Sequence, residues 1–267
     1  MAIGLIVIGD EILSGRRNDK HLPKTIELLG ERGMHLDWAE YIGDDPARIT
    51  ATLRRTFAGD DIVFCTGGIG ATPDDHTRQC AAQALGVPLA LHPEAERLIL
   101  ERIADTSGDG RADLTQADNR HRLKMGEFPV GCEILPNPYN KIPGFSIRRH
   151  HFMPGFPVMA WPMMAWALDH YYLDLHHLRP HGERSMLVFG LAESTLTPLM
   201  EQIETEFAAV KVFSLPSVGD SERGGHYARR HIDLGVKGDP ALLDGAFEAL
   251  RKGVEALGGE IVDPAAA

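Results

Sequence analysis

The segment 61–77 constrains the fold more than any other part of the chain. It reads DIVFCTGGIGATPDDHT and begins with an apolar run at 62–65 that has the length and composition of a buried β-strand. A glycine-rich run, TGGIG, follows directly at 66–70, and the Thr, Pro and Asp residues at 72–77 are typical of a helix start. A strand, a glycine loop and a helix N-terminus in this order indicate an α/β protein with an anion site at a strand end.

Two adjacent carboxylates distinguish this loop from the common phosphate loops. The segment matches neither GxxxxGK[ST] nor GxGxxG, and it places Asp74 and Asp75 beside the glycines. A phosphate next to two carboxylates needs a cation between them, because like charges repel. The segment therefore predicts a phosphorylated ligand with a divalent metal; the structural alternative is an ordinary turn with a capping Asp.

Strand and helix patterns alternate along the first part of the chain. Strands are expected at 3–8, where the run is continuously apolar, at 36–42 and at 146–152, and helices at 22–32 and 47–57. Such alternation predicts a mainly parallel sheet whose functional loops follow the carboxyl ends of the strands. Gly9, Asp10 and Glu11 leave the first strand at such an end. Asp44 follows the second, where it either caps the next helix or contacts the ligand.

Composition excludes several classes of protein. The chain has 267 residues, of which 43% are hydrophobic and 24% charged, as in globular proteins. No apolar run reaches the roughly 18 residues of a membrane span, and the N-terminus has no basic segment or cleavage site. We therefore expect a cytoplasmic protein without a membrane partner. The net charge of −11 argues against a nucleic-acid partner.

The chain is long enough for a second, smaller domain. We expect a large α/β domain over 1–176 and a small α+β domain over 184–262, with the order β-α-β-β-α. The small domain resembles a KH-like module. It has no evident GxxG clamp of the kind that holds RNA backbone. We therefore interpret it as a packing or dimer-forming module, and expect a homo-oligomer, a dimer or a trimer.

Several motifs resemble one known family. TGGIGATPDDHT at 66–77 resembles the TGGxGPTxDDxT signature of the MoCF-biosynthesis (molybdopterin-binding) superfamily, with Ala71 in place of the usual proline. GDEILSGR at 9–16 is similar to the family's opening motif, and in NDKH at 18–21 His21 replaces the usual Asn. NPYNKIPGF at 137–145 and MPGFP at 153–157 resemble two further family loops. Along its length the chain is most similar to the short form of CinA-like proteins.

The resemblance implies a fold and a set of site residues. The fold is a three-layer MogA-like α/β sandwich. The expected catalytic residues are Asp10, Asp74 and Asp75. The expected ligands of a divalent metal are Asp74, Asp75 and Glu11. Binding of the substrate and its phosphate falls to residues in the same and nearby loops: Gly9, Glu11, Gly15, Asp19, Asp44, Thr66, Gly67, Gly68, Gly70, Thr72, Thr77, Asn137, Lys141, Pro154 and Gly155. Lys141 is expected to hold a phosphate oxygen.

The resemblance leaves three functions open. The first is hydrolysis of a nucleoside diphosphate compound, as in ADP-ribose pyrophosphatases, with Mg²⁺, Mn²⁺ or Co²⁺ as Lewis acid. The second is binding or transfer of molybdopterin or an adenylated pterin in molybdenum cofactor synthesis. The third is a non-catalytic nucleotide-binding or assembly protein. In each case the expected partner is a phosphorylated small molecule of the ADP-ribose or pterin type.

Overall fold

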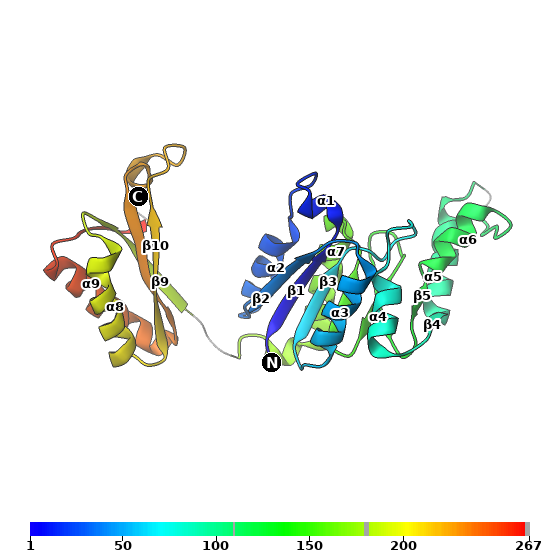
Figure 1. Ribbon diagram of the computed structural model, residues 1–267, viewed down its shortest axis with the longest axis horizontal. Helices are drawn as coiled ribbons and strands as arrows, with labels where there is room; N and C mark the ends of the chain where they lie inside the picture. Colours follow the sequence, from blue (N-terminus) through cyan, green and yellow to red (C-terminus); the bar gives the residue numbers. More distant parts are fainter. Residues whose placement is uncertain (109, 179–181, 265–267) are drawn as a thin grey trace. The chain divides into compact units, whose positions relative to one another are not determined.

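The chain forms two compact units, Met1–His176 and His177–Ala267 (Figure 1). The computed structural model describes residues 1–108, 110–178 and 182–264. None of the helices in these ranges is both long and apolar enough to cross a bilayer. Each unit has its own sheet and its own hydrophobic core, so each is described by itself.

A six-stranded sheet of order β2-β1-β3-β8-β7-β6 forms the centre of the first unit. Four strands are parallel: β1 (Ile3–Ile8), β2 (Trp38–Ile42), β3 (Ile62–Thr66) and β8 (His150–Met153). β7 (Gly144–Ile147) runs antiparallel to β8, and the edge strand β6 (Glu133–Leu135) runs antiparallel to β7. The predicted, mainly parallel sheet is confirmed.

Helices cover both faces of this sheet. α2 (His21–Gly30) and α7 (Pro157–Tyr171) pack on one face, and α3 (Pro46–Phe57) and α4 (Thr77–Leu85) pack on the other (Figure 1). All six residues of β1 are buried because alternate side chains enter the two cores. This explains why the strand reads as a continuous apolar run. The three-layer sandwich is therefore as predicted.

Short elements complete the first unit. α1 (Asp10–Leu13) follows β1, and η1 (Leu173–Leu175) follows α7. α5 (Pro93–Thr106) and α6 (Ala117–Lys124) lie beyond α4, next to a two-stranded ribbon of β4 (Leu89–Leu91) and β5 (Glu127–Pro129) (Figure 1). The ribbon was not predicted, because each strand has only three residues.

The strand predicted over 146–152 is wrong. The chain turns back there, so that β7 and β8 form a hairpin in which Ile147 pairs with His150. Arg148 adopts a φ of 54°, which residues other than glycine seldom adopt. Its Nη1 donates to the carbonyl oxygen of Phe57 at 2.8 Å, and its guanidinium lies over the Phe57 ring. A distant contact thus stabilises a turn that lacks the usual turn residues.

The second unit is a four-stranded antiparallel sheet of order β10-β11-β9-β12 with two helices. Its elements are β9 (Gly182–Phe189), α8 (Glu193–Glu206), β10 (Val210–Ser217), η2 (Gly225–Ala228), β11 (His231–Gly238), α9 (Pro240–Ala256) and β12 (Glu260–Val262). Leu196, Leu234 and Leu250 are fully buried between the helices and the sheet. The predicted β-α-β-β-α order is present, with β12 as an additional edge strand.

Candidate functional site

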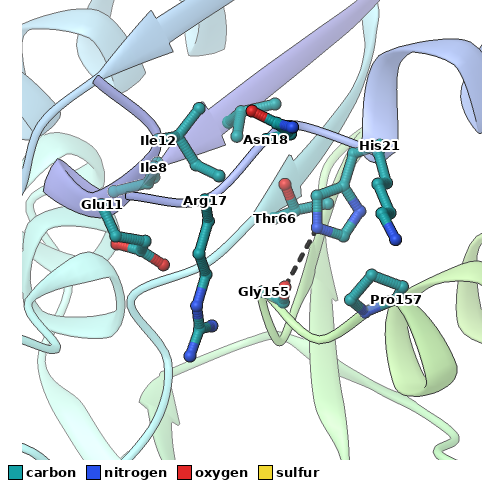
Figure 2. Close-up of a pocket in the computed structure, with 11 residues that line it drawn as sticks. Ile8, Glu11, Ile12, Arg17, Asn18, His21, Thr66, Gly155 and Pro157 are labelled. Carbon is teal, nitrogen blue, oxygen red and sulfur yellow. Dashed lines mark hydrogen bonds between the residues drawn. The ribbon is translucent and has the colours of Figure 1, made fainter. Parts of the chain in front are cut away.

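Two adjoining pockets lie at the carboxyl ends of the parallel strands. The glycine-loop pocket has a volume of about 350 Å³. It is lined by Ile8, Gly9, Glu11, Arg17, Asp44, Gly67, Gly68, Ile69, Gly70, Ala71, Thr72, Asp74, Asp75, Pro154, Gly155 and Phe156. The second, here called the α2 pocket, has a volume of about 340 Å³ (Figure 2). It is lined by Val7, Ile8, Glu11, Ile12, Arg17, Asn18, Lys20, His21, Thr66, Gly155 and Pro157.

The glycine loop holds a conformation that larger residues would not allow. Gly67 has a φ of 102°, and a Cβ there would lie 2.1 Å from the carbonyl oxygen of Ile8. The buried Thr77 ties the loop to α4, since its N–H donates to the Gly68 oxygen at 2.9 Å and its hydroxyl to the Gly67 oxygen at 3.1 Å. Within the described residues no acceptor pairs with the N–H of Gly68 or Gly70. These two groups are free to bind an anion.

Two residues predicted to bind phosphate already have partners for their donors within the chain. The Gly67 N–H donates to the carbonyl oxygen of Met153 at 3.0 Å, so it is already paired. Thr72 uses both its N–H and its hydroxyl on the carboxylate of Asp75, at 2.8 and 2.5 Å. One carboxylate oxygen of Asp75 thus accepts both hydrogen bonds that close the loop. Asp75 therefore has a structural role in addition to any role in catalysis.

Asp10 and Asp44 join the end of β1 to the end of β2. The Asp10 N–H donates to Asp44 Oδ2 at 2.9 Å, and the Asp44 N–H donates to Asp10 Oδ1 at 3.2 Å. Burial raises the pKa of the Asp44 carboxyl above its ordinary value, and the negative charges of Asp10, Glu11 and Asp74 add to this effect. Asp44 lines the glycine-loop pocket and Asp10 does not. Asp44 is therefore the carboxylate of this group that is best placed to accept a proton.

The first alternative for Asp44, that it caps the next helix, is wrong. Asp45 is the N-cap of α3, and its carboxylate accepts from the N–H of Arg48 at 2.7 Å. Asp44 is left to face the pocket. The sequence alone does not separate two adjacent Asp residues that both precede a helix.

Arg17 is a site residue that was not predicted. It lines both pockets, and its side chain extends into the cleft between Glu11 and Gly155 (Figure 2). Its guanidinium lies 5.8 Å from the centre of the Phe156 ring. The backbone N–H of Arg17 donates to the carbonyl oxygen of Glu11 at 3.0 Å, which fixes the position of the backbone from which the side chain extends. The two adjacent arginines, Arg16 and Arg17, that follow Gly15 are the sequence feature from which a phosphate-binding cation could have been predicted.

Lys141 and Asn137, both predicted to bind the substrate, lie outside both pockets. Lys141 Nζ lies 2.7 Å from the carboxylate of Asp105 and 3.8 Å from that of Glu101. Its hydrogen bond with Asp105 raises the pKa of the ammonium. Asn137 is buried and braces its own loop by donating to the Ile142 oxygen at 2.9 Å.

Two other predicted residues, Asp19 and Gly15, lie outside the pockets and determine the backbone next to them. Asp19 accepts from the N–H groups of His21 and Leu22, at 2.8 and 3.0 Å, and from the Tyr41 hydroxyl at 2.7 Å. It therefore fixes the start of α2. Gly15 has a φ of 71° in the turn after α1. Neither residue lines a pocket.

The described residues contain no cluster of three His, Cys, Asp or Glu side chains arranged to hold a metal. Asp74, Asp75 and Glu11 all line the glycine-loop pocket, but they do not form the predicted three-residue ligand set. Mg²⁺ often binds through one or two carboxylates together with phosphate oxygens of the substrate. The donors present fit that mode and not a cage made of protein alone.

Comparison with known proteins agrees with the fold. The model of a family described as "Probable molybdopterin binding domain" matches residues 4–173. A CinA-like protein of Anaeromyxobacter sp. (strain Fw109-5) is 34% identical over 146 residues, which cover 55% of this chain and 34% of the relative. One from Syntrophotalea carbinolica is 30% identical over 216 residues, which cover 77% of this chain and 50% of the relative. The chain thus spans half or less of these relatives.

A solved structure gives the same result. The crystal structure of the protein CinA "with unknown function" from Thermoplasma acidophilum matches with a TM-score of 0.54 and 26% identity. The match covers 63% of this chain and 96% of the other. The family model covers more than half of this chain and includes every pocket residue described above. The chain therefore belongs to the family of probable molybdopterin binding domains, as a CinA-like member.

Proposed function

We propose that the cleft binds a phosphorylated small molecule and, with a divalent metal, hydrolyses a nucleoside diphosphate compound of the ADP-ribose type. The observation that carries this proposal is the grouping of carboxylates beside the glycine loop, where burial first and the neighbouring negative charges second raise the pKa of Asp44. A phosphate can accept hydrogen bonds from the free N–H groups of Gly68 and Gly70. The positive charge of Arg17 attracts the same phosphate.

The proposed reaction is attack of water on one phosphorus of the diphosphate. A new P–O bond forms to the water oxygen, the bond from that phosphorus to the bridging oxygen breaks, and AMP and ribose 5-phosphate leave. Asp44 takes the proton that the water loses. Arg17 holds the phosphate and orients it. Glu11 and Asp74, with the phosphate oxygens, would hold Mg²⁺, Mn²⁺ or Co²⁺, which would neutralise the charge of the diphosphate.

Pterin binding is the second candidate. The family description favours it, and the α2 pocket offers apolar walls for a flat ring. A non-catalytic nucleotide-binding or assembly role is the third, because Ala71 and His21 replace the usual Pro and Asn of the family motifs. A pterin that stays with the purified protein, seen by its fluorescence, would favour the second candidate.

Metal-dependent release of AMP tests the first candidate. The purified chain is incubated with ADP-ribose and with Mg²⁺, Mn²⁺ or Co²⁺ in turn, and AMP is measured by chromatography. We expect AMP with at least one metal and none with EDTA, because the carboxylates need a cation beside a diphosphate. A double variant, Asp74→Asn with Asp75→Asn, should lose the activity. Absence of AMP with all three metals would contradict the hydrolase proposal.

A further inference from the structure

We infer that Arg78 is a positioning residue of the phosphate site, although it lines neither pocket. Its buried guanidinium holds the carbonyl group of Gly70 turned away from the glycine-loop pocket, so that the N–H of the same peptide group, that of Ala71, faces a phosphate. The guanidinium also places a positive charge behind the loop. The inference rests on the proposed function, because it assumes that a phosphate lies against the glycine loop.

The first two residues of α4 hold the carbonyl groups of the glycine loop. The oxygens of Gly67 and Gly68 accept from the hydroxyl and the N–H of Thr77. The oxygen of Gly70 accepts from Nη2 of Arg78 at 2.6 Å. In a trans peptide group the C=O and the N–H point in opposite directions. Each of these hydrogen bonds therefore directs the N–H of the following residue away from its partner on α4; the three residues are Gly68, Ile69 and Ala71.

The three N–H groups belong to residues that line the glycine-loop pocket. Within the described residues none of the three donates to an acceptor of the protein. Thr77 fixes two of these peptide groups and Arg78 fixes the third, whose N–H is that of Ala71. The motif that this segment resembles usually has proline at this position, and proline has no N–H. Ala71 therefore gives this chain a donor that the usual motif lacks.

Arg78 is held by backbone carbonyl groups and not by a carboxylate. Its side chain is buried, with only 4% of the residue exposed, and its guanidinium also donates to the carbonyl oxygen of Lys124, the last residue of α6. Its Nε has no hydrogen-bond partner among the described residues. Asp75 and Glu127 attract its charge through space, but within the same part of the chain neither forms an ion pair with it.

The positive charge of Arg78 is thus not neutralised by a contact within the described chain. Burial of a charge without an ion-pair partner destabilises a fold, and here burial lowers the pKa of the guanidinium. Charges attract each other more strongly in a protein interior than in water. An anion at the glycine loop would compensate this charge, so Arg78 would attract a phosphate that it does not touch.

Arg78→Met tests the inference, because methionine is long and apolar and removes both the charge and the hydrogen bond to Gly70. The probe is methylenediphosphonate with Mg²⁺, a diphosphate analogue whose bridging carbon resists hydrolysis. Calorimetry below the melting temperature should show that the variant binds the probe weaker by roughly tenfold or more, as for loss of a hydrogen bond in a charged site. Arg78→Lys keeps a charge and a donor and should recover most of the affinity. If Arg78→Met does not fold, Arg78→Gln takes its place with the same expected loss.

Amide signals in nuclear magnetic resonance distinguish positioning from a general loss of structure. In the ¹⁵N-labelled wild type, the probe should shift the signals of Gly68, Ile69 and Ala71. In Arg78→Met the shift of the Ala71 signal should be lost. The shift of the Gly68 signal should remain at saturating probe, because Thr77 still holds that peptide group.

Arg148→Met is the matched control. Arg148 also donates to a carbonyl oxygen, that of Phe57 at 2.8 Å, but it precedes β8 and lies outside both pockets. This variant should lose stability and keep its affinity for the probe. The inference is overturned if Arg78→Met binds the probe as tightly as the wild type, or if it loses the Gly68 and Ala71 shifts together. A wild type that does not bind the probe would contradict the proposed phosphate site, and the inference with it.

Discussion

Asp44→Asn is expected to reduce AMP release by roughly 100-fold or more, the usual effect of losing a group that transfers a proton. The asparagine oxygen still accepts from the N–H of Asp10, so the link between β1 and β2 stays in place. The amide has no charge and takes up no proton at neutral pH. Initial rates of AMP release at saturating ADP-ribose measure this effect.

The same variant is expected to be more stable than the wild type at neutral pH. Burial and three neighbouring carboxylates raise the pKa of Asp44 in the folded chain. The folded state therefore binds this proton more tightly than the unfolded state, and the stability that protonation provides is lost as the pH rises through the folded pKa. Thermal unfolding at several pH values should show the variant above the wild type at pH 7, with the difference narrowing in acid.

Asp45→Asn is the control for both effects. Asp45 is the adjacent carboxylate, but it caps α3 and does not line the glycine-loop pocket. Asparagine caps helices as well as aspartate does, so activity and stability should stay close to those of the wild type. Equal loss of activity in the two variants, or full activity in Asp44→Asn, would show that Asp44 is not the proton acceptor.

The centre of the fold could be predicted because its signals are local. The apolar runs of β1 and β3, the glycines after β3 and the Thr72-to-Thr77 helix start each lie within a few residues of one another. They fix a parallel sheet and the loop at its edge without knowledge of distant contacts. For the same reason most of the predicted residues in the loops after β1, β3 and β8 do line the glycine-loop pocket.

The differences between prediction and structure concern contacts between distant parts of the chain. Lys141 follows a loop that resembles a ligand-binding loop, but its ammonium pairs with Asp105 at the end of α5. The turn at Arg148 depends on the carbonyl oxygen of Phe57, which lies on α3. Neither partner is visible in the local sequence. A charge on a long, flexible side chain can reach many partners, so the sequence around it does not decide which one it takes.

We propose that Arg17, and not Lys141, holds the phosphate. Within the described residues, Arg17 is the only Lys or Arg that lines the glycine-loop pocket. An arginine holds phosphate oxygens through two parallel hydrogen bonds, which a lysine does not provide. Its guanidinium lies 5.8 Å from the centre of the Phe156 ring and forms no ion pair with a carboxylate of the described residues, so the cation is available to a ligand.

Arg17→Gln is therefore expected to weaken binding of inorganic pyrophosphate by about 10- to 100-fold, as for loss of hydrogen bonds to a charged group. Arg16→Gln removes the same charge from the exposed neighbour outside both pockets, and Lys141→Gln removes the charge that was first expected to act. Both should bind pyrophosphate nearly as the wild type does in calorimetry at fixed ionic strength. If Lys141→Gln weakens binding and Arg17→Gln does not, the ion pair with Asp105 opens when the ligand binds, and the phosphate site must be assigned to Lys141 instead.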